Sequence, residues 1–245
     1  MTMKKITYLL AAAALLLLPS CRFIRVSDQA MEELESHYTL GGKSGERIKA
    51  SNNYITRNDV TGEFHSLTSN LPGNIIYTPG DCSVSLYGPD NVLDHITVYN
   101  ENGFLEIKSN LYRITNLKEL TVKVSSPVLE SLNFNGAVDF KAPDGITALN
   151  FNATLNGAGD IHISGLQANE AALTVNGAAD ASIKGLDCDF IQVSINGAGD
   201  ATLAGKAGSA DLTISGAGDI DAEHLQCDDL NTKVRGVGSI KKPKN

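Results

Sequence analysis

The chain has 245 residues, with 28 acidic and 20 basic side chains, a formal net charge of −8 and no tryptophan. The negative charge is concentrated in residues 139–229, where 14 Asp and Glu face only three lysines. A surface of this sign repels a phosphate backbone, so the composition excludes nucleic acid as a partner and indicates a well-solvated surface.

Residues 1–20 have the composition of a secretory signal peptide. Lys4-Lys5 precedes an apolar run of 13 residues, 6–18, which is too short to cross a membrane as a helix. The run closes on Leu18-Pro19-Ser20-Cys21, which resembles a bacterial lipobox except for its proline. The resemblance implies cleavage before Cys21 and attachment of lipid, palmitate included, to this cysteine, which would anchor the protein to the membrane. An ordinary signal peptide is the alternative.

Residues 21–50 are polar and show no strand alternation, and their last part is rich in glycine and serine. This composition predicts a lipidated flexible tether in front of a folded domain at 51–245. A tethered lipoprotein is expected in the cell envelope, at the outer membrane. The sequence does not decide between the periplasmic and the surface face of this membrane. An acidic motif after the cysteine often accompanies surface export, and here Arg22-Phe23-Ile24-Arg25 follows instead.

Alternating apolar residues, many of them β-branched, predict short strands between residues 54 and 124. The expected strands are 74–77, 83–87, 96–99, 104–107 and 120–124, with a helical turn at 90–95. Turn sequences such as Asn100-Glu101-Asn102-Gly103 separate them. This part is therefore an irregular half made of β-strands.

A Gly-Ala-Gly-Asp phrase, or a close variant, returns six times in the second half of the chain. The leading glycines are spaced by 21, 20, 20, 19 and 20 residues: Gly136, Gly157, Gly177, Gly197, Gly216 and Gly236. A fixed period near 20 predicts one coil of a solenoid per repeat, over residues 128–241.

The apolar positions repeat with the same period. Val193 and Ile195, for example, are expected to point inward, and Gln192 and Ser194 outward. Three short strands per coil account for this pattern. The repeat of 19 residues lacks one residue near Gly205, and this deletion is expected at a corner between strands. The sequence predicts an all-β, single-stranded parallel β-helix, because the LxxLxL frame of leucine-rich repeats is absent.

The order of these motifs resembles the head GIN domains of auto-transporter adhesins, common in lipoproteins of Bacteroidetes-like bacteria. Besides Asn-Gly-Ala-Gly-Asp, the resemblance includes Phe64-His65-Ser66-Leu67, Gly103-Phe104-Leu105-Glu106-Ile107 and Pro127-Val128-Leu129-Glu130. It covers about residues 60–240. It implies a right-handed β-helix on a cell-envelope protein, and no established activity.

The strongest candidate for chemistry is a column of aspartates that repeats once per coil: Asp139, Asp160, Asp180, Asp200 and Asp219. A stack of carboxylates could bind cations or act on sugars. In the alternative, each Asp accepts hydrogen bonds from its own glycine-rich corner. Identical repetition favours this alternative, because a catalytic site is a single position whereas a structural feature recurs in every coil.

A second column consists of asparagines: Asn135, Asn156, Asn176 and Asn196. It predicts an internal ladder in which each amide bonds to the next coil; a polar face that binds a ligand is the less favoured alternative. Cys188 and Cys227 share one coil position two coils apart, about 10 Å, which is too far for a disulfide. We interpret both as core residues; the state of Cys82 stays open.

We predict no enzyme, cofactor, catalytic residue or metal site, because no hydrolase, P-loop or zinc motif is present. The expected function is structural, adhesive or ligand-binding. The expected ligand is an unidentified envelope or extracellular molecule, and the sequence does not decide whether the protein forms a homo-oligomer. A polysaccharide-binding or polysaccharide-degrading protein is the alternative. Most aromatic residues precede the repeats, so under this alternative the glycan would bind to the leading half.

Overall fold

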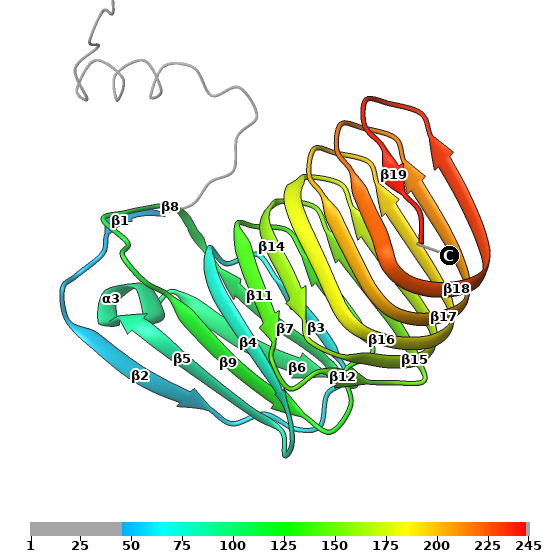
Figure 1. The fold of residues 1–245 in the computed structure, drawn as a ribbon. Helices are drawn as coiled ribbons and strands as arrows, with labels where there is room; N and C mark the ends of the chain where they lie inside the picture. Colours follow the sequence, from blue (N-terminus) through cyan, green and yellow to red (C-terminus); the bar gives the residue numbers. More distant parts are fainter. Residues whose placement is uncertain (1–45, 244–245) are drawn as a thin grey trace, which may run out of the picture. The chain divides into compact units, whose positions relative to one another are not determined.

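The computed structural model describes residues 46–243 (Figure 1). The predicted signal peptide, Cys21 and most of the predicted tether lie outside the described residues. Strand β1 (Glu46–Lys49) falls within the last part of the predicted tether and pairs in parallel with β8 (Leu111–Thr115). The folded domain therefore begins before residue 51. The local sequence did not predict this strand, because the partner that orders β1 lies far along the chain. No helix in the described residues is long and apolar enough to cross a membrane.

The leading half contains the predicted strands and some that were not predicted. The alternating segments form β4 (Gly73–Pro79), β5 (Ser83–Pro89), β6 (Ile96–Glu101), β7 (Phe104–Ser109) and β9 (Thr121–Ser126), and the helical turn forms α3 (Asp90–Leu93). Not predicted, besides β1 and β8, are β2 (Tyr54–Asp59) and β3 (Ser66–Ser69). β5 pairs antiparallel with β2 and β9, and β6 with β7 makes an antiparallel hairpin.

The leading half continues directly into the solenoid. β10 (Ser131–Phe134) lies in parallel between β3 and β13 (Asn150–Leu155), and β3 in turn pairs with β7. In the same way β11 (Val138–Ala142) joins β4 to β14 (Ala158–Ile163). The irregular strands thus supply the first rungs of the solenoid faces, and the two halves share one sheet.

The repeats form the predicted parallel β-helix, a β-solenoid of about six turns. Its remaining strands are β12 (Ile146–Thr147), β15 (Leu166–Val175), β16 (Ala178–Ile195), β17 (Ala201–Ile214), β18 (Ile220–Val234) and β19 (Ile240–Lys241). The three predicted strands per coil merge into longer curved strands in β16 to β18, because hydrogen bonding continues around the corners. The register slips by one residue between Ile183 and Leu186, opposite Gly205, as the predicted deletion requires.

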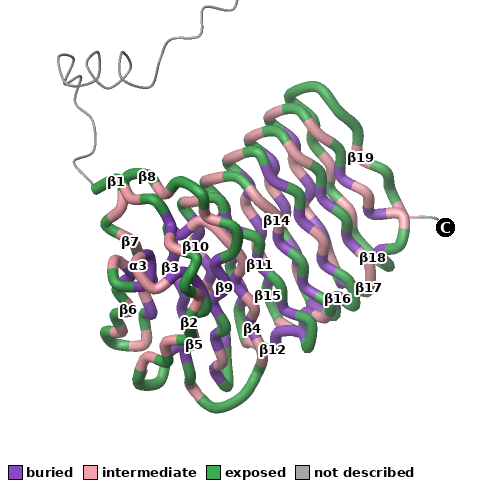
Figure 2. Tube along the Cα trace, turned by 90° about the vertical axis from the view of Figure 1, so that its left-hand side faces the viewer, coloured by how far each residue is buried: buried purple, intermediate pink, exposed green. Residues whose placement is uncertain are grey.

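The core is one continuous column of inward side chains. Leu173 pairs with Val193, which pairs with Leu212, and all three are buried. Val193 and Ile195 are inaccessible to solvent and Gln192 is exposed, so the predicted alternation is confirmed. Buried and exposed positions alternate along the coils in Figure 2. Burial of this apolar surface against the next coil supplies the main stabilising term.

The leading glycines mark the closest approach between coils. A Cβ built on Gly177 would lie 1.7 Å from the carbonyl oxygen of Gly157, which no side chain can tolerate. Gly199, at the third position of its phrase, would place a Cβ 1.9 Å from the oxygen of Ala179 and has φ +154°. The glycines are therefore needed because one coil's backbone rests on the next.

Candidate functional site

The aspartate column is a ladder of hydrogen bonds between coils. The Oδ1 atom of each Asp accepts the backbone N–H of the Asp in the following coil: Asp139 from Asp160 at 3.2 Å, Asp160 from Asp180 at 3.4 Å, Asp180 from Asp200 at 2.8 Å and Asp200 from Asp219 at 2.8 Å. The predicted bond to the residue's own corner is therefore wrong. The coil spacing of about 4.8 Å brings the next coil's amide within reach of the carboxylate.

The ladder ends at Ser239, which replaces Asp in the last repeat. Its backbone N–H and its hydroxyl both donate to Asp219 Oδ1, at 2.7 and 2.8 Å. These bonds hold the pKa of Asp219 below its ordinary value, the hydroxyl contributing most. A lowered pKa in the folded state contributes stability that is present above the ordinary Asp pKa and is lost as the pH falls through the folded-state value.

The asparagine column is also a ladder, but it lies on the surface. The Nδ2 group of each Asn donates to Oδ1 of the Asn one coil earlier: Asn156 to Asn135 at 2.9 Å, Asn176 to Asn156 at 2.8 Å and Asn196 to Asn176 at 2.9 Å. All four side chains are exposed, so the prediction of an internal ladder is wrong in its location. The amides bind one another and hold the coils in register.

The three described cysteines are free thiols. Ala207 separates Cys188 from Cys227 in the stack, which matches the predicted two-coil distance. Cys188 is buried, and burial raises the pKa of its thiol to about 11. Cys227 is only half-buried because it lies in the terminal coil, so it belongs to the core less completely than predicted. Cys82 is half-buried and free.

Exposed aromatic side chains gather on the leading half, as the sequence indicated. Phe104 is 60% exposed, Tyr112 52% and Tyr99 50%, whereas Phe140 and Phe151 of the solenoid are buried. Phe104 and Tyr99 belong to the β6–β7 hairpin. An exposed ring on this hairpin can stack on a flat apolar ligand surface.

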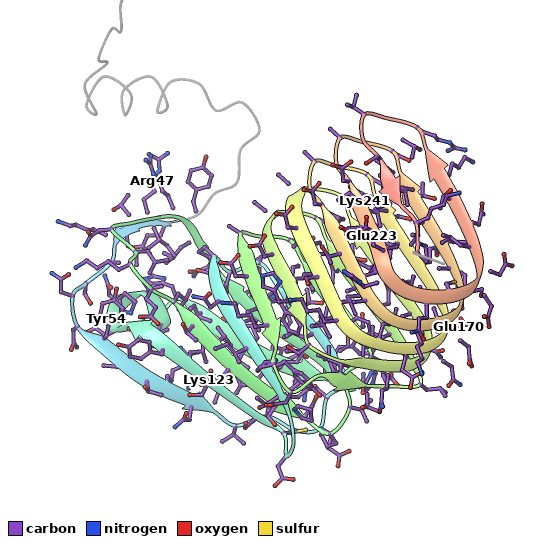
Figure 3. All side chains as sticks on the ribbon, viewed as in Figure 1. Arg47, Tyr54, Lys123, Glu170, Glu223 and Lys241 are labelled. Carbon is purple, nitrogen blue, oxygen red and sulfur yellow. The ribbon has the colours of Figure 1, made fainter. Side chains whose placement is uncertain are left out.

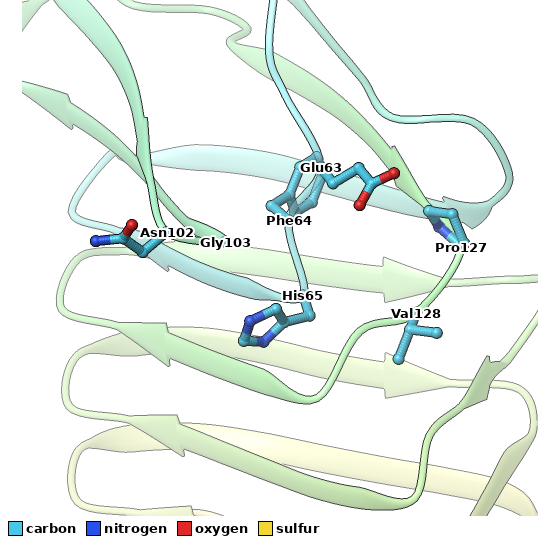
Figure 4. Close-up of a pocket in the computed structure, with 7 residues that line it drawn as sticks. All are labelled: Glu63, Phe64, His65, Asn102, Gly103, Pro127 and Val128. Atoms are coloured by element: carbon cyan, nitrogen blue, oxygen red, sulfur yellow. The ribbon is translucent and has the colours of Figure 1, made fainter.

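A hollow of about 490 Å³ lies on one side of the hairpin turn (Figure 4). Its walls are Glu63, Phe64, His65, Asn102, Gly103, Pro127 and Val128. The His65 ring lies between two fixed neighbours. Its Nδ1 atom is 3.2 Å from Glu130 Oε2, and the ring contacts Phe104 edge-on with 5.5 Å between centroids. The histidine thereby links the hollow to the exposed phenylalanine.

The backbone of the hairpin turn fixes this arrangement. Asn102 and Gly103 have φ values of +52° and +84°, as a tight two-residue hairpin of type I′ requires. A Cβ on Gly103 would lie 2.6 Å from His65 Nε2, so any other residue there would displace the His65 ring. The carbonyl of Gly103 also accepts the backbone N–H of His65 at 3.0 Å.

A second hollow of about 360 Å³ lies beside the exposed rings. It is lined by Thr68, Tyr99, Glu101, Asn102, Phe104, Leu105 and Glu106. The Glu106 carboxylate forms an ion pair with Lys108 at 2.6 Å, and the Glu101 carboxylate raises the pKa of Tyr99 through a hydrogen bond to its hydroxyl. We call the two hollows and the rings between them the hairpin surface. It combines aromatic faces with carboxylate, amide and hydroxyl groups.

The solenoid also has a hollow of about 360 Å³, lined by Glu130, Asn150, Phe151, Asn152, Glu170, Ala171, Ala172, Phe190 and Gln192. Its one partly exposed aromatic ring is Phe190, since Phe151 is buried. The solenoid hollow therefore offers less aromatic surface than the hairpin surface does. Among the described residues, no group of three or more His, Cys, Asp or Glu side chains is arranged to hold a metal ion.

Sequence reasoning named the leading half but missed the residues of the hairpin surface. Phe104 carried a usable signal: Leu105 and Ile107 point inward, so a large aromatic residue at the preceding position must point outward. His65 and Glu130 had no such signal, because they lie far apart in the chain and meet only through the pairing of β3 with β10.

The Asp ladder makes a direct prediction. Asp180→Ala removes the acceptor for the Asp200 N–H and should lower the free energy of unfolding by about 1 kcal/mol or less, because water can partly replace it. Asp180→Asn keeps an oxygen acceptor and should change stability by less than about 0.5 kcal/mol. Chemical denaturation of both variants measures the difference. A melting temperature that rises in millimolar Ca²⁺, and no longer rises in Asp180→Asn/Asp200→Asn, would instead make the column a cation site.

Solved structures with the same fold come from Bacteroides and Parabacteroides species. A "putative adhesin" from Bacteroides fragilis NCTC 9343 is 24% identical with a TM-score of 0.69, over 80% of this chain and 99% of that chain. Another from Parabacteroides merdae ATCC 43184 is 20% identical with a TM-score of 0.71, over 80% and 83%. A "putative lipid binding protein" from Parabacteroides distasonis ATCC 8503 is 17% identical with a TM-score of 0.54, over 81% and 100%. At these identities the likeness establishes the fold alone.

Membership of a family is shown by comparison of the amino-acid sequence, and not by the likeness of fold. No curated protein matches the chain. The sequence model of one family matches residues 63–185 and 154–242, a span that includes both the hairpin surface and the repeats. This span is most of the chain, and the protein therefore belongs to the family described as "Putative auto-transporter adhesin, head GIN domain".

Proposed function

We propose that the protein is a lipid-anchored module of the cell envelope that binds a carbohydrate in an adhesive role. The lipobox-like sequence that ends at Cys21, behind a signal-like segment, supports the anchor and an outer-membrane location. The description of the family and the names of the Bacteroides and Parabacteroides structures support an adhesive role. The hairpin surface is the proposed contact with the ligand.

The observation that carries this proposal is the side-by-side placement of exposed rings and polar groups on the hairpin surface. Phe104 and Tyr99 present aromatic faces next to the carboxylates of Glu101 and Glu106 and the amide of Asn102. A pyranose ring has an apolar C–H face that stacks on an aromatic ring and hydroxyls that bond to carboxylates and amides. The repeated Asp and Asn columns, by contrast, direct their polar groups to the neighbouring coil.

We propose binding without cleavage, and polysaccharide degradation is the rival. Hydrolysis of a glycosidic bond needs one carboxyl group that holds a proton near neutral pH and a second carboxylate at a set distance. The carboxylate of Glu106 already forms an ion pair with Lys108 at 2.6 Å, so it is not free to serve as one member of such a pair. The test for cleavage is the appearance of new reducing ends when the protein is incubated with a polysaccharide that it binds.

The binding prediction uses residues 22–245, produced without the predicted signal peptide and Cys21 and applied to a glycan array. The double variant Phe104→Ala/Tyr99→Ala should lose affinity for the bound glycan by at least about tenfold, because both stacking faces are removed. Tyr112→Ala is the matched control, since its ring is equally exposed but lies on β8, and it should bind like the wild type. Absence of any bound glycan, or equal loss in the control, would contradict the proposal.

The anchoring prediction concerns Cys21. In cells, the wild-type protein should partition into the detergent phase and carry a lipid-modified N-terminal cysteine by mass spectrometry. Cys21→Ala should yield a protein in the aqueous phase or one that keeps its signal peptide, because no acyl chain can be attached. A Cys21→Ala protein that has lost its signal peptide and still partitions with the membrane would show that another feature anchors the chain.

A further inference from the structure

The C-terminal end of the solenoid is an open sheet edge. One edge of β18 pairs with β17 along most of its length, whereas β19 pairs with β18 only at Ile220 and Asp221. Within residues 46–243, no strand covers the outer edge of residues 225–234. Figure 1 shows β18 as the last long strand of the stack. An exposed edge of this length is a template for another strand.

The unpaired hydrogen-bonding groups of this edge belong to alternate residues. The outward-facing Arg235 donates its backbone N–H to Ile214 of the preceding coil at 2.7 Å, and Ser215 bonds to Ile195 at 2.7 Å in the same way. In a parallel ladder, successive residues direct their N–H and C=O groups to opposite neighbours. The inward-facing Leu230, Thr232 and Val234 therefore direct theirs toward the open edge.

The end of the apolar core is uncovered at the same place. Ala210, Leu212 and Ile214 are buried, but the residues stacked on them in the last coil are accessible. Val234 is 44% exposed, and Leu230 is half-buried. A terminal coil of a solenoid ordinarily needs a polar cap, and here apolar side chains occupy two of the three inward positions.

The charges along the edge make it complementary to itself. Asp229 faces outward at one end of this stretch, and Lys233 and Arg235 face outward at the other. An antiparallel pair centred on Thr232 sets Leu230 opposite Val234 and Asp229 opposite Arg235, with Lys233 diagonal to Asp229. The residues with outward-directed N–H and C=O groups then meet each other, as antiparallel bonding requires. Lys241 of the neighbouring β19 is labelled in Figure 3, and its Nζ forms an ion pair with Asp221 Oδ2 at 3.4 Å.

We propose that two copies of this chain associate end to end through antiparallel pairing of residues 229–235 of β18. The contact is isologous, since each copy supplies both Asp229 and its basic partners, so it closes as a twofold dimer and does not propagate into fibres. It covers Leu230 and Val234 and pairs the backbone of both edges. This inference is independent of the proposed carbohydrate ligand and goes beyond it, because the surface lies on the last coil and not on the hairpin.

The test is the molar mass of residues 22–245, without the predicted signal peptide and Cys21, by light scattering and sedimentation over a range of concentrations. The wild type should have twice the mass of one chain. Asp229→Arg and Lys233→Glu/Arg235→Glu should each weaken the dimer at least tenfold, because like charges then meet across the edge. An equimolar mixture of the two variants should regain the dimer. Asp187→Arg, an exposed charge change two coils away, should dimerise like the wild type.

Three results would overturn the proposal. One is a wild type that stays monomeric up to the highest concentration, including a monomer whose residues 225–234 are protected from hydrogen exchange by another segment of the chain. The second is a dimer that the charge reversals leave intact. The third is a mixture of the two reversed variants that stays monomeric although each variant melts cooperatively, since restored charge pairing is the signature of this register.

Discussion

The whole solenoid depends on the contact between backbones at the glycine corner. Each leading glycine lies so close to the preceding coil that a Cβ would overlap a carbonyl oxygen, as at Gly177 over Gly157. This contact lets coils stack at the spacing of hydrogen-bonded strands even where the chain turns. Once the corners are stacked in register, equivalent residues of successive repeats must lie directly above one another, and the apolar columns of the core follow.

Exact stacking decides which polar residues can act as a site. In a column, the nearest partner of each side chain is its own counterpart in the next coil, so the Asp and Asn side chains bind the solenoid itself. Residues that occur once are not drawn into such ladders. The hairpin surface is of this kind: the residue stacked next to Phe104 in the neighbouring rung is Ser66, and not another phenylalanine. The proposed self-association at the last coil follows from the same rule, because the outer edge of β18 lacks a strand neighbour along most of its length within the described residues.

The sequence was sufficient for most of the fold, since a period of 20 and alternation of apolar residues are local signals. It located β4, β5, β6, β7 and β9 of the leading half and the corner that absorbs the deletion at Gly205. It could not show that β3 and β4 continue the solenoid faces, because their partners β10 and β11 lie far along the chain. It also missed the true donor to each Asp carboxylate, which is a backbone N–H of the next coil, and the meeting of His65 with Glu130. Both depend on contacts between coils.

One measurement tests the dependence on the glycine corner most directly: the thermal unfolding of Gly177→Ala beside Gly165→Ala. Both glycines lie in the repeats, but a Cβ on Gly165 would meet no atom closer than 3.9 Å. Gly177→Ala should lower the free energy of unfolding by about 1–3 kcal/mol and the melting temperature by roughly 3–10 °C, because the two coils must separate. Gly165→Ala should be nearly neutral. Equal melting temperatures for the two variants would contradict the account, since the coils would then not be in backbone contact at Gly177.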